Sequence, residues 1–119
     1  MKQSCNLEVQ IKKRVMRALI DTGADCSCIS SKLVSELNIP VTKYRQNILV
    51  QSALSNSSHQ SKWVFVATKI GSTIYKLKFC IIDGLNPNII IGRSHCEKLK
   101  IDIKFSTGTI TIQGEIFSV

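Results

Sequence analysis

The chain has 119 residues, of which 44% are hydrophobic, and it carries 16 Lys and Arg against 8 Asp and Glu. This length corresponds to one domain with a modest core, so we expect residues 1–119 to form a single domain. The hydrophobic content argues against disorder, no apolar run approaches the length of a membrane span, and the N-terminus lacks the apolar core of a signal peptide. We therefore expect an intracellular protein without a membrane partner.

The formal net charge of +8 raises the question of nucleic-acid binding. The lysines are spread along the whole chain, and only 6% of the residues are aromatic, with no stacking motif. A solvated basic surface is therefore favoured, and nucleic-acid contact is expected to be weak at most. A non-catalytic basic nucleic-acid-binding module is the alternative from a different functional class.

The five cysteines, an odd number, indicate free thiols in a reducing compartment and not a disulfide framework. A zinc site is disfavoured because Cys26 and Cys28 have C-x-C spacing, and His95 and Cys96 are neighbours whose side chains would diverge on a helix. We expect no metal and no cofactor.

The first part of the chain predicts two strands and a helix. Apolar residues alternate with polar ones over residues 7–11, and a more buried run follows at residues 15–20 after a basic turn. Ser30 or Ser31 can then cap a short helix carrying Leu33, Val34 and Leu37, which Asn38 and Pro40 would end.

The middle of the chain predicts a long hairpin. Strands are expected at residues 46–51, 62–70 and 73–82, with a tight turn at Gly71 and Ser72. The polar stretch QSALSNSSHQS, residues 51–61, lies between the first two strands and is interpreted as a hairpin tip.

The last part predicts a strand at residues 88–92 that ends in glycine, and then a short helix at residues 94–99. Two further strands are expected at residues 101–105 and 109–117, joined by a hairpin-like turn. Asp83 and Gly84 are interpreted as an ordinary turn.

Two motifs lie about 70 residues apart, and each follows an apolar strand. The first is LIDTGAD, residues 19–25, and the second is IIGR, residues 90–93. In this order and at this separation they resemble the retroviral-type aspartic proteases, the retropepsins, in which the first motif carries the catalytic loop and the second closes the core beneath it. The resemblance covers approximately residues 5–105.

Peptide hydrolysis by this family agrees with the residues present. A water must lie between one carboxylate that accepts its proton and one carboxylic acid that polarises the scissile carbonyl. Two carboxyl groups in close contact share a proton and supply both roles. The chain has a single Asp-Thr-Gly sequence, so the second carboxyl group must come from a second copy in a twofold homodimer.

The resemblance implies a role for each residue of the first motif. Asp21 is half of the catalytic dyad, Thr22 bonds across the twofold axis, and Gly23 lets the backbone approach the substrate. Ala24 lines the cleft, and Asp25 binds the substrate backbone.

The resemblance also assigns the second motif to the support of the site. Ile91 and Gly92 belong to the core beneath the catalytic loop. Arg93 would pair with Asp25, because an Arg-carboxylate fork is charge-assisted and directional.

Two features depart from the family. Cys26 stands where many relatives have a second acid next to the substrate. The family's flap over the cleft would correspond to residues 51–61, which contain no glycine, and Ala53, Leu54 and Ser55 are its expected substrate contacts.

The resemblance implies an all-β fold, a closed retropepsin-like acid-protease barrel with a flap hairpin and one or two short helices. It also implies an aspartic endopeptidase that cleaves the polyprotein of a virus or retroelement, such as a plant pararetrovirus or an LTR retrotransposon. Such a protein would act in the host cytoplasm or within virus-like particles. A cellular domain of the same type, used in protein quality control or as a dimerisation scaffold, is the alternative.

Overall fold

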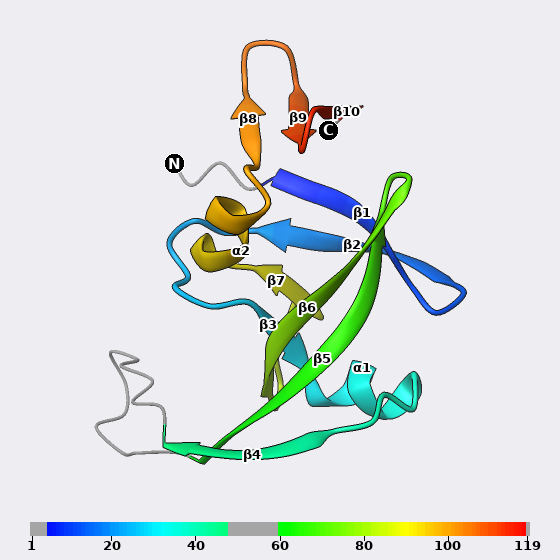
Figure 1. Cartoon of the computed structure of the whole chain (residues 1–119), viewed down its shortest axis with the longest axis vertical. Coiled ribbons are helices and arrows are strands. Elements are labelled where there is room, and N and C mark those ends of the chain that lie inside the picture. Colours follow the sequence, from blue (N-terminus) through cyan, green and yellow to red (C-terminus); the bar gives the residue numbers. More distant parts are fainter. Residues whose placement is uncertain (1–4, 48–59, 119) are drawn as a thin grey trace.

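The computed structural model describes residues 5–47 and 60–118. This part of the chain is mostly β, with two short helices (Figure 1). In chain order the elements are β1 (Cys5–Ile11), β2 (Arg14–Ile20), β3 (Cys28–Ser30), α1 (Ser31–Glu36), β4 (Thr42–Asn47), β5 (Gln60–Ile70), β6 (Thr73–Ile82), β7 (Ile89–Ile91), α2 (Arg93–Lys98), β8 (Asp102–Lys104), β9 (Thr109–Ile112) and β10 (Glu115–Ser118).

Six strands close into a barrel in the order β1-β2-β7-β3-β6-β5, because β5 also pairs with β1. The 11-residue strand β5 is long enough to pair with two other strands along the same edge. Its first part pairs with β4, and Thr68 and Lys69 near its end pair with β1. The predicted closed all-β fold with two short helices is therefore confirmed.

The strands of the barrel form because apolar side chains alternate along them and face one interior. Strand β1 follows this pattern through Leu7, Val9 and Ile11, which are 1 to 2% exposed. Burial of each such side chain contributes approximately 1.5 to 3 kcal/mol. The largest fully buried side chains are Phe79, Ile11, Ile29, Leu33, Ile70, Leu77, Ile89, Ile91, Ile110, Ile112, Val9 and Val64.

The short strand β7 lies between β2 and β3 and connects the two sequence motifs. It runs parallel to the end of β2, with Ile20 opposite Ile91, and antiparallel to β3, with Cys28 opposite Ile90. The segment between β2 and β3 contains residues 21–25 of the first motif. Strand β7 therefore holds both ends of that segment.

The two helices begin at serine and glycine caps. The Ser30 hydroxyl accepts a hydrogen bond from the backbone N–H of Leu33 at 3.1 Å, as the predicted cap requires, and Leu33 and Val34 are buried. Helix α2 begins after Gly92. Each helix has six residues, and no helix in the described ranges could span a bilayer.

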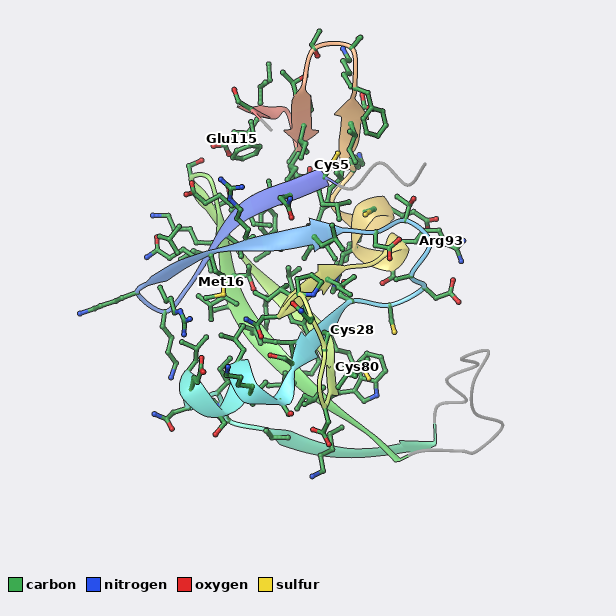
Figure 2. All side chains as sticks on the ribbon, turned by 180° about the vertical axis from the view of Figure 1, so that it is seen from behind. Cys5, Met16, Cys28, Cys80, Arg93 and Glu115 are labelled. Carbon is green, nitrogen blue, oxygen red and sulfur yellow. The ribbon has the colours of Figure 1, made fainter. Side chains whose placement is uncertain are left out.

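The C-terminal part forms a separate three-stranded sheet in the order β10-β9-β8, whose residues Ile110 and Ile112 belong to the main core. Strand β10 contacts the turn between β5 and β6, where Glu115 accepts hydrogen bonds from the N–H and the hydroxyl of Ser72 at 3.2 and 3.1 Å. Figure 2 shows Glu115 beside this turn.

One strand prediction was wrong, and one strand was missed. The expected strand at residues 109–117 is two strands, because Gln113 and Gly114 have positive φ angles of 51° and 84° and reverse the chain. Strand β3 was not predicted, since three residues are too few to show a periodicity.

Two other predictions fall largely outside the described residues. Strand β4 begins earlier than the expected strand at 46–51, and the part of that expectation after Asn47 is not described. The expected flap tip is almost wholly undescribed too, including Ala53, Leu54 and Ser55.

Candidate active site

Asp21 lies directly after β2, and its own loop orients its side chain. The backbone N–H of Asp21 donates to the carbonyl of Ile91 at 3.0 Å, which continues the pairing between β2 and β7. The N–H of Gly23 donates to Asp21 Oδ1 at 3.0 Å, and the N–H of Ala24 donates to the Asp21 carbonyl at 3.1 Å. This Asx turn holds a half-exposed carboxyl group in one orientation at the end of a rigid strand pair.

Gly92 provides the close contact between the two motifs. A Cβ atom on Gly92 would lie 2.5 Å from the backbone carbonyl of Cys26 and 2.9 Å from the carbonyl oxygen of Ala24. Next to it, the N–H of Arg93 donates to the Ala24 carbonyl at 2.7 Å, and the N–H of Ser94 donates to the Asp25 carbonyl at 3.3 Å. Only glycine fits here, because any side chain would push the loop away from the start of α2.

Arg93 and Asp25 form the expected ion pair, in which an Nη atom of Arg93 donates to Asp25 Oδ1. Figure 2 shows Arg93 pointing outward beside the loop. The side chains are 56% and 83% exposed, so the pair contributes at most about 1 kcal/mol to folding. Its effect is to orient the Asp25 carboxylate.

The other site residues predicted from the sequence lie around Asp21. Thr22 and Gly23 are exposed, whereas Ala24 is half-buried. Ile91 is fully buried beneath the loop. The structure thus brings all the predicted site residues that lie within the described ranges to one end of β2 and β7.

Ser27 and His95 form a buried network that was not found from the sequence. The N–H of Gly92 donates to Ser27 Oγ at 2.9 Å, and Ser27 Oγ is also hydrogen-bonded to His95 Nδ1. Because the serine oxygen accepts from Gly92, its own proton points to His95 Nδ1, which must be unprotonated. A single serine and a single histidine 68 residues apart carry no sequence signal that would link them.

The environment of His95 favours its neutral form. The ring is 7% exposed, and its burial together with the positive charge of Lys98 lowers the pKa of His95 below its ordinary value of 6.5. The neutral ring can accept a hydrogen bond from the Ser27 hydroxyl, so the network beneath the loop is intact near neutral pH.

Three thiols lie where the loop enters β3. Cys26 is half-buried, and Cys28 and Cys80 are buried opposite each other on β3 and β6. A hydrogen bond from the Cys28 thiol lowers the pKa of Cys26 to about 7, and the same interaction with burial raises the pKa of Cys28. All five cysteines lie in the described ranges, and none of them is in a disulfide.

In the described part of the chain, neither a metal-binding cluster nor the cavity beside α1 involves these residues. Within the described ranges, no three His, Cys, Asp or Glu side chains are grouped to hold a metal ion. A cavity of about 530 Å³ lies beside α1, lined by residues such as Val34, Ile39 and Lys62, and it includes none of the candidate site residues.

Solved structures with the same fold include proteases and protease-like domains. The retroviral protease-like domain of Ddi1 from Leishmania major is 13% identical over 99% of this chain and 94% of its own, with a TM-score of 0.78. A retropepsin-like aspartic protease from Rickettsia conorii is 16% identical over 85% of this chain and 76% of its own, with a TM-score of 0.62. EIAV protease in complex with an inhibitor is 20% identical over 88% of this chain and 96% of its own, with a TM-score of 0.66. These likenesses establish a retropepsin-like fold.

Sequence comparison identifies the family. No curated protein sequence matches the chain. The model of the PEG10/RTL1 protease domain matches residues 17–118, which include both motifs and the thiol-bearing segment between β2 and β3. The chain therefore belongs to the PEG10/RTL1 protease domain family and is a retropepsin-like aspartic protease domain.

Proposed function

We propose that the chain is an aspartic endopeptidase and that Asp21 supplies one of the two carboxyl groups of its dyad. The observation that carries this proposal is the fixed, half-exposed Asp21 carboxyl at the paired ends of β2 and β7. A catalytic carboxyl group needs a defined orientation and access to substrate, and this position offers both.

The second carboxyl group comes from a second copy of the chain. A dyad needs one proton shared between two close carboxyl groups, so that one accepts the proton of a bound water while the other polarises the peptide carbonyl. The other Asp-Gly pair, Asp83 and Gly84, is in an exposed turn after β6 and lacks the Asp-Thr-Gly sequence. A twofold homodimer places two copies of Asp21 face to face.

The neighbouring residues assist in this arrangement. The exposed Thr22 hydroxyl bonds across the twofold axis, and the exposed Gly23 leaves room for the substrate backbone. Ala24 and Cys26 line the cleft. Asp25, oriented by its ion pair, accepts a hydrogen bond from the substrate backbone.

The proposed support is the second motif, in which Ile91, Gly92 and Arg93 hold the loop from below through backbone contacts. The flap contacts proposed from the sequence, Ala53, Leu54 and Ser55, would close over the substrate.

The proposed substrate is the polyprotein of a virus or retroelement, cleaved in the host cytoplasm or within virus-like particles. Membership of the PEG10/RTL1 protease domain family supports a polypeptide substrate. A cellular protein as substrate, or a role as a dimerisation scaffold, is the alternative.

The test compares Asp21→Asn with the matched control Asp83→Asn, which changes an exposed aspartate in a turn outside the candidate site. The purified chain is incubated with its own upstream and downstream polyprotein segments, with and without a pepstatin-like inhibitor. Asp21→Asn should abolish cleavage and leave the fold intact, and Asp83→Asn should cleave like wild type. Equal cleavage by both variants would refute the assignment.

Assembly is tested with the same variant. Mixing wild-type and Asp21→Asn chains should reduce activity below simple dilution, because mixed dimers carry an impaired dyad. Specific activity should also fall on dilution and return on concentration. A monomer with full turnover per chain would contradict the dimeric mechanism, and a dimer that cleaves no polypeptide would favour the scaffold.

A further inference from the structure

Three thiols meet at the boundary between the candidate catalytic loop and β3. Cys28 and Cys80 face each other on the parallel strands β3 and β6, which Figure 2 shows side by side. They form a small cluster with Trp63, which is 6% exposed and whose indole N–H has no hydrogen-bond partner within the described part of the chain. Cys26 contacts this cluster from its edge and is half-buried. Oxidants therefore reach Cys26 before the two buried thiols.

Cys26 and Cys28 are placed to react with each other. Ser27 between them points into the buried network with His95 and Gly92. Cys26 packs against the cluster that contains Cys28, and the two thiols interact through a side-chain hydrogen bond. The Cys28 thiol also donates to the Cys26 carbonyl at 3.7 Å, which brings its sulfur back toward Cys26.

We propose that Cys26 and Cys28 are a reversible dithiol–disulfide site that hydroperoxides oxidise, and that their disulfide inactivates the adjacent Asp21 loop. The inactivation rests on the proposed protease function. Formation of the disulfide does not, so the two can be tested separately.

The chemistry proceeds in two steps. The Cys26 thiolate attacks the terminal oxygen of the hydroperoxide, the O–O bond breaks, and an alcohol or water leaves with a proton from solvent, so that Cys26 becomes a sulfenic acid. The Cys28 sulfur then attacks the Cys26 sulfur, and the sulfenic oxygen leaves as water with the Cys28 proton. The sulfurs are oxidised, the peroxide is reduced, and an added dithiol reverses the change.

The pKa values of the two thiols differ in the way that these two chemical steps require. With a pKa of about 7, Cys26 is substantially thiolate at neutral pH, which is the form that attacks peroxide. The main cause of the raised pKa of Cys28 is its hydrogen bond to Cys26. Once Cys26 is a neutral sulfenic acid that cause disappears, and Cys28 becomes easier to deprotonate for the second step.

A disulfide here would disturb the loop because the backbone of this segment is packed tightly against Gly92. Disulfide geometry fixes the two sulfurs in direct bonding contact and constrains both backbones. The Cys26 carbonyl already abuts Gly92, and Ser27 lies between the two cysteines and holds the Gly92 N–H. Pulling residues 26 and 28 together therefore shifts the support of Asp21.

The test uses the full chain treated with hydrogen peroxide, alkylated and digested with trypsin. Cleavage after Arg17 and Lys32 releases both cysteines in one peptide, residues 18–32, whereas Cys80 is released in the peptide 79–93. The proposal expects the first peptide to lose two hydrogens and resist alkylation until a dithiol is added. A crosslink between the two peptides, or five thiols that all remain alkylatable, would overturn it.

Variants identify the order of events. Cys26→Ser should slow thiol loss about tenfold or more, because it removes the thiol that is substantially thiolate at neutral pH. Cys28→Ser should trap a sulfenic acid on Cys26, detectable with a dimedone label. Cys5→Ser, which removes a buried thiol on β1 outside the cluster, should oxidise like wild type. Thiol loss in Cys26→Ser at the wild-type rate would refute the role of Cys26.

Activity is the separate readout. In wild type, loss of polyprotein cleavage should follow the appearance of the disulfide in the same samples and return fully with a dithiol. Full activity in samples whose 18–32 peptide is completely oxidised would refute the inactivation and leave the disulfide and the proposed protease function standing. A chain that never cleaves polypeptide would refute the protease, while the peptide masses would still test the disulfide.

Discussion

Gly92→Ala should destabilise the protein, although it adds a single methyl group. Gly92 has φ −86° and ψ 175°, which any residue adopts, so the variant introduces no backbone strain. The new Cβ would lie 2.5 Å from the Cys26 carbonyl and 2.9 Å from the Ala24 oxygen. These are backbone atoms and cannot rotate away, so the loop or the start of α2 must move.

The expected cost follows from two effects. Overpacking at a site that cannot relax costs approximately 1 to 3 kcal/mol. Movement of Gly92 also weakens the hydrogen bond from its N–H to Ser27, which contributes approximately 1 kcal/mol. The total of about 2 to 4 kcal/mol, at a urea m-value of about 2 kcal/mol/M, corresponds to a midpoint lowered by about 1 to 2 M.

The measurement is urea unfolding at one fixed protein concentration, because dimer formation would change the apparent stability. Gly84→Ala is the matched control, since its Cβ would meet nothing within 4 Å but its φ of 72° is strained for alanine. That strain costs about 1 kcal/mol. A wild-type midpoint for Gly92→Ala, or a stability no lower than that of Gly84→Ala, would contradict the expected steric clash.

The other predictions concern the network beneath the loop and the dimer. Ser27→Ala leaves the Gly92 N–H buried without its acceptor and should lower the free energy of unfolding by about 1 to 3 kcal/mol in the same assay. The pKa of His95 is lower in the folded chain than its ordinary 6.5, so its contribution to stability is complete above pH 6.5 and is lost as pH falls through the folded pKa. His95→Asn keeps an acceptor near the Nδ1 position and should flatten the dependence of stability on pH below 6.5, and an unchanged slope would exclude His95 as its cause. Thr22→Ala should raise the dimer dissociation constant measured by sedimentation without changing the secondary structure, and an unchanged constant would place Thr22 outside the interface.

Much of the fold could be predicted because its signals are local. The strand at residues 73–82 was predicted with the observed bounds, since its alternation is long and Gly71 marks the turn before it. The helix after Ser30 follows from a capping hydroxyl and a buried apolar pair. In contrast, the split at Gln113 depends on a positive φ that glutamine rarely adopts.

Some features of the candidate site could likewise be predicted from the sequence, and others could not. The two motifs and the ion pair of Asp25 with Arg93 could be expected from a resemblance that extends over both. The contact of Ser27 with His95 could not, because it joins single residues 68 positions apart and depends on the packing of α2 against the loop. The position of Cys28 opposite Cys80 likewise follows only from the register of two parallel strands.

The hydrogen bonds of the loop leave most acceptor positions of the Asp21 carboxyl group unoccupied. Backbone N–H groups of Arg93 and Ser94 hold the carbonyls of Ala24 and Asp25, and none of these bonds involves the Asp21 side chain. A carboxylate has about four acceptor positions, and in the described part of the chain only the Gly23 N–H occupies one, on Oδ1. A half-exposed carboxyl group so rigidly held and so sparsely bonded has room for a water and for a second carboxyl group. Substitutions at the supporting residues should therefore lower stability and activity together, whereas Asp21→Asn should remove activity alone.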